Sequence, residues 1–180
     1  MKYMIASDIH GSKYYADLMR EAFFSEKADR LILLGDLLYH GPRNDLPKDY
    51  EPKAVIEILN SLKDRIIAVR GNCDAEVDQM VLDFPIMADY AVLPYGERTI
   101  YLSHGHIYGE ENPLKLQKGD ILLCGHTHVP KCTDKGSFIY MNPGSVSIPK
   151  EMSPHGYMTL EDGRFSWKSF SDGEWLNYEI

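Results

Sequence analysis

Short apolar runs recur along the chain, and each has the length of a single β-strand. Each run is nearly continuous in apolar residues and closes with glycine or a polar cluster, which is typical of strands covered on both faces. The runs span residues 3–7, 30–35, 65–71, 99–105 and 120–125. They predict strands at the centre of the fold.

Two helical patterns lie between the first three runs. Ser12 is a residue type that caps helix N-termini, and the residues after it repeat their apolar positions with helical spacing. The first stripe consists of Tyr15, Leu18, Ala22 and Phe23, and the second of Val55, Ile58, Leu59 and Leu62. We interpret both stripes as helix faces that pack against the core. The Pro-rich, charged segment 41–52 between them is expected to form an exposed loop.

From residue 88 onward the pattern changes to strands joined by tight turns. Turn residues lie at 95–97, 134–136 and 162–163, each between strand-like segments, so three hairpins are expected. Alternating strands and helices followed by strands alone predict an α/β fold with mixed sheets.

The length and charge narrow the class of protein. The chain has 180 residues, which suits a single domain over residues 1–180 with a sizeable core. Its formal net charge of -8 argues against a stable nucleic-acid complex, because such proteins normally present a basic face. The aromatic residues Phe165, Trp167, Phe170 and Trp175 could pack internally or form the surface of a homo-oligomer. We favour internal packing.

Cysteine usage and hydropathy bear on the compartment. Cys73, Cys124 and Cys132 cannot all pair with one another, and a chain of this size needs no disulfide framework. No apolar run approaches the ~20 residues that cross a membrane. Asp8 and His10 lie too early in the chain for a signal peptide. We therefore expect a cytoplasmic protein without membrane attachment.

Metal-binding residue types follow all five apolar runs. They are Asp8, His10, Asp36, Asn72, His104, His126 and His128. A single Asp-x-His pair is a weak signal, but recurrence at equivalent strand ends is stronger, because such ends face one crevice in an open α/β sheet. Seven N and O ligands are too many for one structural zinc ion and suit two divalent ions that share a carboxylate. Two divalent ions carry more positive charge than the two carboxylates neutralise. The remaining positive charge could hold a hydroxide and a phosphate group.

These motifs resemble the signature of the calcineurin-like metallophosphoesterases. The matching stretches, in order, are Asp8-x-His10, Gly35-Asp36, Gly71-Asn72, His104 and Gly125-His126-x-His128. The stretches YHGPRND, RGNCD and NPGSVSIPK also resemble the small YfcE-type phosphodiesterases of bacteria and archaea. The resemblance covers nearly everything up to Lys150.

The resemblance implies a four-layer α/β/β/α sandwich of two mixed sheets. It implies hydrolysis of a small phosphodiester by a hydroxide that bridges two metal ions. One ion would be held by Asp8, His10, Asp36 and His128, and the other by Asp36, Asn72, His104 and His126, with Asp36 as the bridge. Manganese is common in the small bacterial members, with iron, zinc, nickel or magnesium as alternatives.

Two positions depart from the family pattern. Many members have a second acidic residue where this chain has Tyr39, so a supporting carboxylate is missing or comes from elsewhere, such as Asp45. Many members also have a histidine that assists the leaving group where this chain has Cys73. A thiol, with an ordinary pKa of ~8.5, is a weaker acid than an imidazole at ~6.5. We expect Cys73 to line the substrate side of the site, as neither ligand nor nucleophile.

Other residues are candidates for the substrate side. His106 and His40 could donate a proton in place of the absent histidine, and Arg43 could bind a phosphate oxygen or be a solvated loop charge. We interpret His155 as a solvated loop histidine and Cys124 as a small buried residue.

Two further functions remain open besides a phosphodiesterase. One is a phosphomonoesterase or protein phosphatase of the same fold. The other is a non-catalytic scaffold, similar to the retromer subunit of this fold, whose metal site is degraded. The presence of all seven ligand residues favours catalysis.

Overall fold

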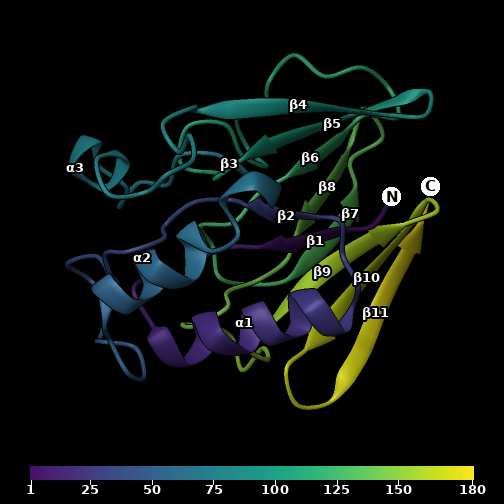
Figure 1. The fold of residues 1–180 in the computed structure, drawn as a ribbon. Coiled ribbons are helices and arrows are strands. Elements are labelled where there is room, and N and C mark those ends of the chain that lie inside the picture. The colour runs from purple at the N-terminus through teal and green to yellow at the C-terminus, as the bar shows by residue number, and fades with distance from the viewer.

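The computed structural model describes all 180 residues and contains two β-sheets that pack face to face (Figure 1). The six-stranded sheet has the order β11-β10-β9-β1-β2-β3. Its strands are β1 (Tyr3–Ala6), β2 (Arg30–Leu33), β3 (Ile66–Ala68), β9 (Gly156–Glu161), β10 (Arg164–Ser169) and β11 (Gly173–Glu179). Strands β1, β2 and β3 are parallel, and β9 to β11 are antiparallel, so the sheet is mixed.

The five-stranded sheet has the order β4-β5-β6-β8-β7 and is also mixed. Its strands are β4 (Tyr90–Tyr95), β5 (Arg98–Ser103), β6 (Ile121–Leu123), β7 (Lys131–Asp134) and β8 (Ile139–Asn142). Strands β5, β6 and β8 run parallel, with β4 and β7 antiparallel at the two edges. The hairpins β4–β5, β7–β8 and β9–β10 turn where the sequence predicts.

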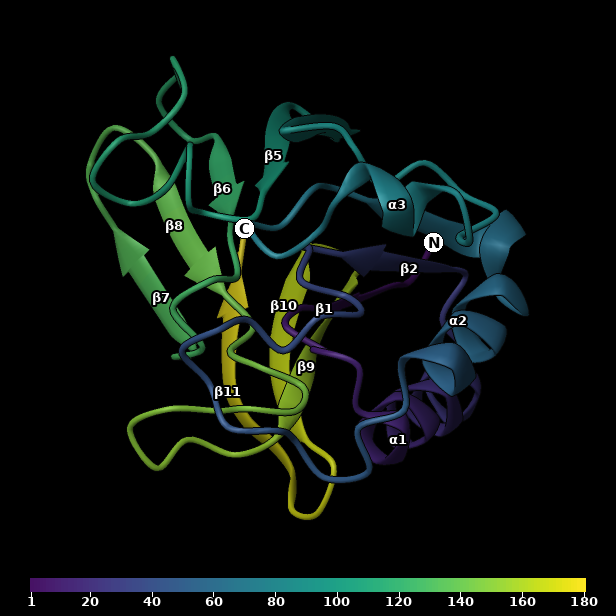
Figure 2. The ribbon, with the colours of Figure 1, turned by 90° about the vertical axis from the view of Figure 1, so that its left-hand side faces the viewer.

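Helices α1 (Lys13–Ser25) and α2 (Pro52–Asn60) cover the outer face of the six-stranded sheet (Figure 2). Ser12 caps α1 by accepting a hydrogen bond from the backbone N–H of Tyr15 at 3.4 Å, and α2 begins with a proline, which is favoured in the first turn. A short 3₁₀ turn (Lys63–Arg65) and helix α3 (Glu76–Gln79) flank β3.

Alternate residues of the central strands face different layers. Met4 and Ala6 of β1 pack in the core beneath the helices, whereas Tyr3 and Ile5 belong to the core between the two sheets. Both faces of the strand are therefore dry, which explains why the apolar runs are continuous and do not alternate with polar residues. No helix is long and apolar enough to cross a membrane.

The outer face of the five-stranded sheet has a different cover. The segment 104–120 lies over it without forming a helix, and Leu116 packs against a small cluster that includes Leu122 and Tyr140. Gly105, Gly109, Pro113 and Gly119 interrupt this segment, and glycine and proline disfavour a helix. The two mixed sheets of the expected sandwich are confirmed, and irregular chain takes the place of its second helical layer.

One minor expectation is wrong. His155 is not a solvated loop histidine, because its ring stacks on that of Tyr15, with the centroids 4.0 Å apart. Its Nδ1 lies 3.0 Å from the carbonyl oxygen of Val146, and its Nε2 lies 2.9 Å from the Tyr15 hydroxyl. Cys124, by contrast, is fully buried as expected.

The C-terminal aromatic residues differ in burial and offer a direct test of the core. Trp167 is fully buried and donates its indole N–H to the carbonyl of Asn142 at 2.7 Å, whereas Trp175 is 46% exposed. We expect Trp167→Ala to lower the free energy of unfolding by about 3–5 kcal/mol. The matched change Trp175→Ala should cost less than about 1 kcal/mol. Urea denaturation measures both, and equal losses would contradict the assignment of Trp167 to the core.

Candidate metal centre

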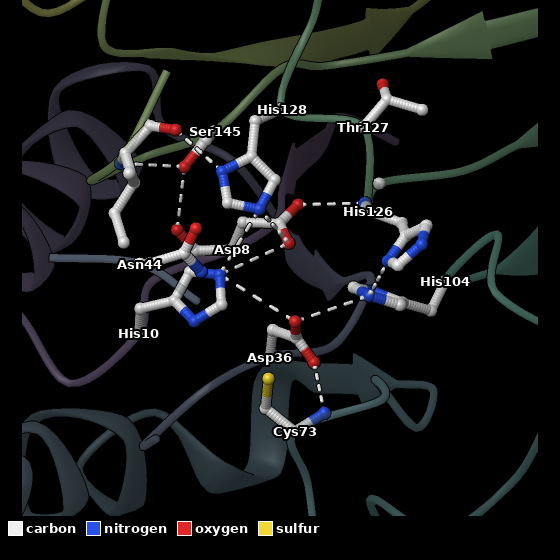
Figure 3. Close-up of polar contacts among 12 residues, drawn as sticks. Asp8, His10, Asp36, Asn44, Cys73, His104, His126, Thr127, His128 and Ser145 are labelled. Atoms are coloured by element: carbon white, nitrogen blue, oxygen red, sulfur yellow. Dashed lines mark hydrogen bonds and ion pairs between the residues drawn. The ribbon is translucent and has the colours of Figure 1, made fainter. Parts of the chain in front are cut away.

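The loops that follow the parallel strands of both sheets bring their polar side chains together at one place (Figure 3). Ala6, Leu33 and Ala68 are in register at the ends of β1, β2 and β3, and Leu102 and Leu123 pair at the ends of β5 and β6. The loops that follow carry all seven predicted ligand residues. Residues up to 120 positions apart in the sequence are therefore brought into one site by strand register within each sheet and by the packing of the two sheets.

Five of the seven ligand residues have left-handed backbone conformations. They are Asp8, His10, Asp36, His126 and His128, with φ between 50° and 66°. Non-glycine residues rarely adopt this region, and each costs of the order of 1 kcal/mol. Asp and His tolerate it better than branched residues do. The surrounding contacts therefore hold the backbone in a shape that turns these side chains toward a common point.

Glycines allow the loops to approach one another. A Cβ at Gly71 would lie 2.1 Å from the Asp36 carboxylate, and one at Gly125 would lie 1.9 Å from the Ser7 hydroxyl oxygen. Such distances are far shorter than any van der Waals contact. The glycines of the Gly-Asn and Gly-His-x-His motifs are thus required by close packing of the neighbouring loop.

Three histidines are fixed in one orientation by the backbone. The Nδ1 atoms of His10, His104 and His128 lie 2.8, 2.7 and 2.6 Å from the carbonyl oxygens of Tyr39, Leu34 and Ile148, respectively. A carbonyl can only accept, so each Nδ1 donates, and each ring turns its Nε2 toward the centre of the site. This is the arrangement that orients histidines toward metal ions.

The first group of side chains surrounds an unpaired carboxylate oxygen. Asp8 Oδ1 is buried without a hydrogen-bond donor. The Nε2 atoms of His10 and His128 lie 3.6 and 3.3 Å from it, and 3.3 Å from each other. Lone pairs at such spacing repel unless a proton or a metal ion lies between them. The donor set therefore fits a divalent cation.

The second group meets the first at Asp36. The Oδ2 atom of Asp36 lies 3.7 Å from His10 Nε2 and 3.4 Å from His104 Nε2, so one oxygen faces both groups. The Nε2 atom of His104 is also 3.0 Å from Asn72 Oδ1 and 3.2 Å from His126 Nδ1. These four side chains could hold a second cation that shares Asp36 with the first.

Supporting residues that the sequence reasoning did not single out hold the loops in place. Asp74 accepts backbone N–H bonds from Asp36, Leu37 and Gly71 at 2.7–2.9 Å, which ties the loops after β2 and β3 together. Ser145 and Ser147 donate their hydroxyls to the carbonyl of Asp8 at 2.9 and 3.0 Å. All three side chains are buried. In the sequence, these residues are marked only by their position within RGNCD and NPGSVSIPK, which resemble stretches of the YfcE-type phosphodiesterases.

Comparison with known proteins decides the family. Residues 1–162 match the calcineurin-like phosphoesterase superfamily domain. The chain belongs to this superfamily. It is 46% identical to the phosphodiesterase YfcE of Escherichia coli over 96% of this chain and 94% of that protein. The solved structure of that phosphoesterase matches over 100% of both chains with a TM-score of 0.97 and 44% identity.

A more distant similarity concerns the fold alone. Vps29 of Chaetomium thermophilum matches 99% of this chain and 98% of its own, with a TM-score of 0.64 and 16% identity. The predicted family, its YfcE-type branch and an enzyme that hydrolyses phosphoric esters are confirmed by the closer matches.

Cys73 lies at the edge of the candidate metal centre. Its backbone N–H donates to Asp36 Oδ1 at 2.8 Å, and its sulfur accepts a hydrogen bond from the Asn72 amide at 3.2 Å. Burial, followed by the charge of Asp36, raises the pKa of the Cys73 thiol to about 12. The sulfur also lies within 4.8 Å of the ligand atoms of His10 and Asp36. A thiol so placed is protonated near neutral pH and directs the Asn72 oxygen toward His104.

The other substrate-side candidates are not all in the same place. Arg43 and Cys73 line a cleft of about 480 Å³ over the candidate ligands, together with Asn44, Thr127 and Lys150. His106 and His40 do not line this cleft. His106 lies in an adjoining pocket with Gly105 and Gly125, and His40 packs edge-on against Tyr39 and Tyr50.

The departure at Tyr39 has a structural answer. The backbone carbonyl of Tyr39, rather than a side-chain carboxylate, accepts the Nδ1 proton of His10. Asp45, the candidate for a substitute carboxylate, is exposed in its loop, and its side chain makes no hydrogen bond to the site. The orientation of His10 therefore needs no second acidic residue.

Metal binding should release protons. Burial alone would lower the pKa of His104, but Asp36 raises it to about 9 in the metal-free protein. His104 is therefore protonated at neutral pH, and a cation at its Nε2 must displace that proton. Metal affinity should rise between pH 6 and pH 9 by about tenfold per pH unit for each proton displaced.

Calorimetry in buffers of different ionisation enthalpy counts the released protons. His104→Asn should remove one proton from the count, whereas His106→Asn should leave it unchanged, because burial and the charge of His104 lower the pKa of His106. A metal affinity that does not change over this pH range would contradict the prediction.

Proposed function

We propose that the protein is a phosphodiesterase that depends on two divalent metal ions. One ion would be held by Asp8, His10, Asp36 and His128, and the other by Asp36, Asn72, His104 and His126. The observation that carries this proposal is the position of Asp36 Oδ2, which faces a ligand nitrogen of both groups at 3.4–3.7 Å. Two metal ions about 3.5–4 Å apart commonly share such an oxygen in phosphoesterases.

When bound, such ions would supply the positive charge that activates water and offsets charge on the phosphate oxygens. The chain itself contributes orientation. Backbone carbonyls fix three histidine rings, and Asp74 holds the loops that carry Asp36 and Asn72 together. Because these contacts are made by the backbone, the ligand set is prepared before any substrate enters.

The cleft over the site suits an anionic ester. It contains the cations Arg43 and Lys150 and the amide of Asn44, and Asp36 is its one carboxylate. The side chains of Arg43 and Lys150 take part in none of the ion pairs of the structure. An arginine fork donates two hydrogen bonds to a phosphate oxygen, so Arg43 is the better candidate for substrate binding.

Cys73 favours a diester over a monoester. A protonated thiol with a pKa of about 12 is a poor proton donor at neutral pH, so the leaving group receives little acid assistance from it. A diester carries one charge fewer than a monoester dianion and presents a second ester group for binding. The similarity to a phosphodiesterase supports the same preference.

Manganese is our proposal for the metal, with iron, zinc, nickel or magnesium as alternatives. A mixed N and O donor set accepts several first-row ions, and supply often decides among them. We also propose a cytoplasmic location, because all three cysteines are unpaired and free thiols are typical of reducing compartments.

Two alternative functions can be separated from a phosphodiesterase in one assay that compares a diester with a monoester. A phosphomonoesterase would prefer a monoester when both substrates are assayed side by side after metal loading. A scaffold with the fold of Vps29 would hydrolyse neither ester after metal loading. The complete set of seven ligand residues favours catalysis over the scaffold.

Substitution at Cys73 separates a cleft-lining role from a ligand or nucleophile. We expect Cys73→Ala to keep diester turnover within about tenfold of the wild type, because the ligand set is complete without the sulfur. Asp36→Ala should abolish turnover, since it removes the oxygen shared by both groups. Rates with bis(para-nitrophenyl) phosphate after manganese loading measure the difference. If Cys73→Ala falls to the level of Asp36→Ala, the proposed role of Cys73 is wrong.

A histidine at the same position tests the general-acid argument. Cys73→His should raise monoester hydrolysis relative to diester hydrolysis, because imidazole donates a proton more readily near neutral pH. General-acid assistance is typically worth ~10²–10⁴-fold, so the ratio should change by at least about tenfold. Cys73→Ser is the matched control, because a serine side chain has neither the imidazole nor the thiol. An unchanged ratio in Cys73→His counts against the argument.

A further inference from the structure

An apolar groove lies beside the metal-binding cleft. It has a volume of about 450 Å³, and its lining includes Tyr39, Tyr50, Ile56, Cys73, Val77 and Val81. We refer to this surface as the apolar groove. Tyr39 and Tyr50 each pack edge-on against the ring of His40, with centroids 4.8 and 5.2 Å apart, so its aromatic wall is supported from within.

Several apolar side chains that line the groove are exposed to solvent. Val77 is 62% exposed, Tyr39 43% and Val81 42%. Contiguous exposed apolar residues on a soluble protein commonly mark a binding surface. The one carboxylate on the lining belongs to Asp78, which accepts a hydrogen bond from the Ala75 N–H at 2.8 Å.

The groove is continuous with the candidate metal centre. Cys73 lines both the groove and the cleft that contains Asp36, and its backbone N–H donates to the Asp36 carboxylate. Tyr39 belongs to the groove through its side chain, while its carbonyl oxygen lies 2.8 Å from Nδ1 of the candidate ligand His10. The groove therefore lies next to the candidate metal centre, on the other side of Cys73.

The metal-binding cleft and the apolar groove differ in charge. The cleft carries Arg43 and Lys150, which suit the charged phosphate, whereas eight of the ten groove residues are hydrophobic. Sites for small molecules typically combine an apolar wall with a few polar groups, and 300–1,000 Å³ is their usual range. The groove therefore suits a neutral apolar group, and its volume is ample for an aromatic ring.

We propose that the apolar groove binds an aromatic or aliphatic ester group of the phosphodiester substrate. The proposal rests on the proposed function, since it gives that site a substrate class. It also gives position 73 a second role, because Cys73 is the residue that lines both the cleft and the groove. Substrates with a second phosphate group on this arm are disfavoured.

Competitive inhibition by two diesters tests the proposal. Dimethyl phosphate and methyl phenethyl phosphate are both monoanions without a good leaving group, and they differ in the apolar arm alone. Each is tested against hydrolysis of bis(para-nitrophenyl) phosphate by the manganese-loaded protein. We expect the phenethyl ester to inhibit about tenfold more tightly, from burial of its ring. Equal inhibition constants would overturn the proposal.

Two variants with the same chemistry locate the effect. Val77→Asp places a charge in the groove, and aspartate is favoured in the first turn of a helix, so the fold should tolerate it. Val92→Asp places the same charge on β4, at a valine that is 50% exposed. The ratio of the two inhibition constants should fall toward one in Val77→Asp and remain about tenfold in Val92→Asp. The same loss in both variants would contradict a role for the groove.

Direct binding gives a readout that does not depend on turnover. In the zinc-loaded protein, methyl phenethyl phosphate should shift the methyl NMR signals of Val77 and Val81, whereas dimethyl phosphate should not. If light scattering shows a dimer that Val77→Asp dissociates with the inhibition ratio unchanged, the groove belongs to a second copy and the proposal is wrong. Absence of all diester turnover would contradict the proposed function, while the NMR shifts still test the groove.

Discussion

The carboxylate of Asp36 is the group on which both halves of the site depend. One of its oxygens accepts the Cys73 N–H, and the other faces His10 and His104. Its own loop is held through Asp74, which accepts N–H bonds from both sides of the junction between β2 and β3. The two sheets carry different candidate ligands. The two sheets must therefore pack so that ligands from both of them reach the Asp36 carboxylate. An error in the packing of either sheet would separate the two groups.

Much of the fold could be predicted because the central strands are covered on both faces. Tyr3 and Ile5 of β1 face one core, and Met4 and Ala6 face the other. The sequence of this strand is therefore apolar throughout, and the first polar residues after it mark where the strand ends. Ligands placed just after such ends were visible for the same reason. Elements at the edge of the fold lack such a continuous apolar run and are harder to predict. Strand β11 has mostly exposed residues, and α3 has four residues, too few for a helical stripe.

The supporting residues of the site were harder to predict, since their partners are backbone groups. Asp74, Ser145 and Ser147 bond to main-chain atoms of loops far away in the sequence, and no spacing rule connects them. The Tyr39 carbonyl that orients His10 is invisible in a sequence, because every residue has one. Side-chain chemistry therefore revealed the candidate ligands, and only tertiary structure revealed what holds them.

The left-handed backbone at five ligand positions has a consequence for how such a site can change over evolutionary time. Glycine and asparagine occupy this conformation more easily than most other residues, whereas β-branched residues are strongly disfavoured there. A descendant that no longer needs Asp8 or His126 as a ligand can therefore accept few residue types without distorting the loop. Loss of function at these positions should leave a recognisable trace of small or amide residues, with the sheets around them intact.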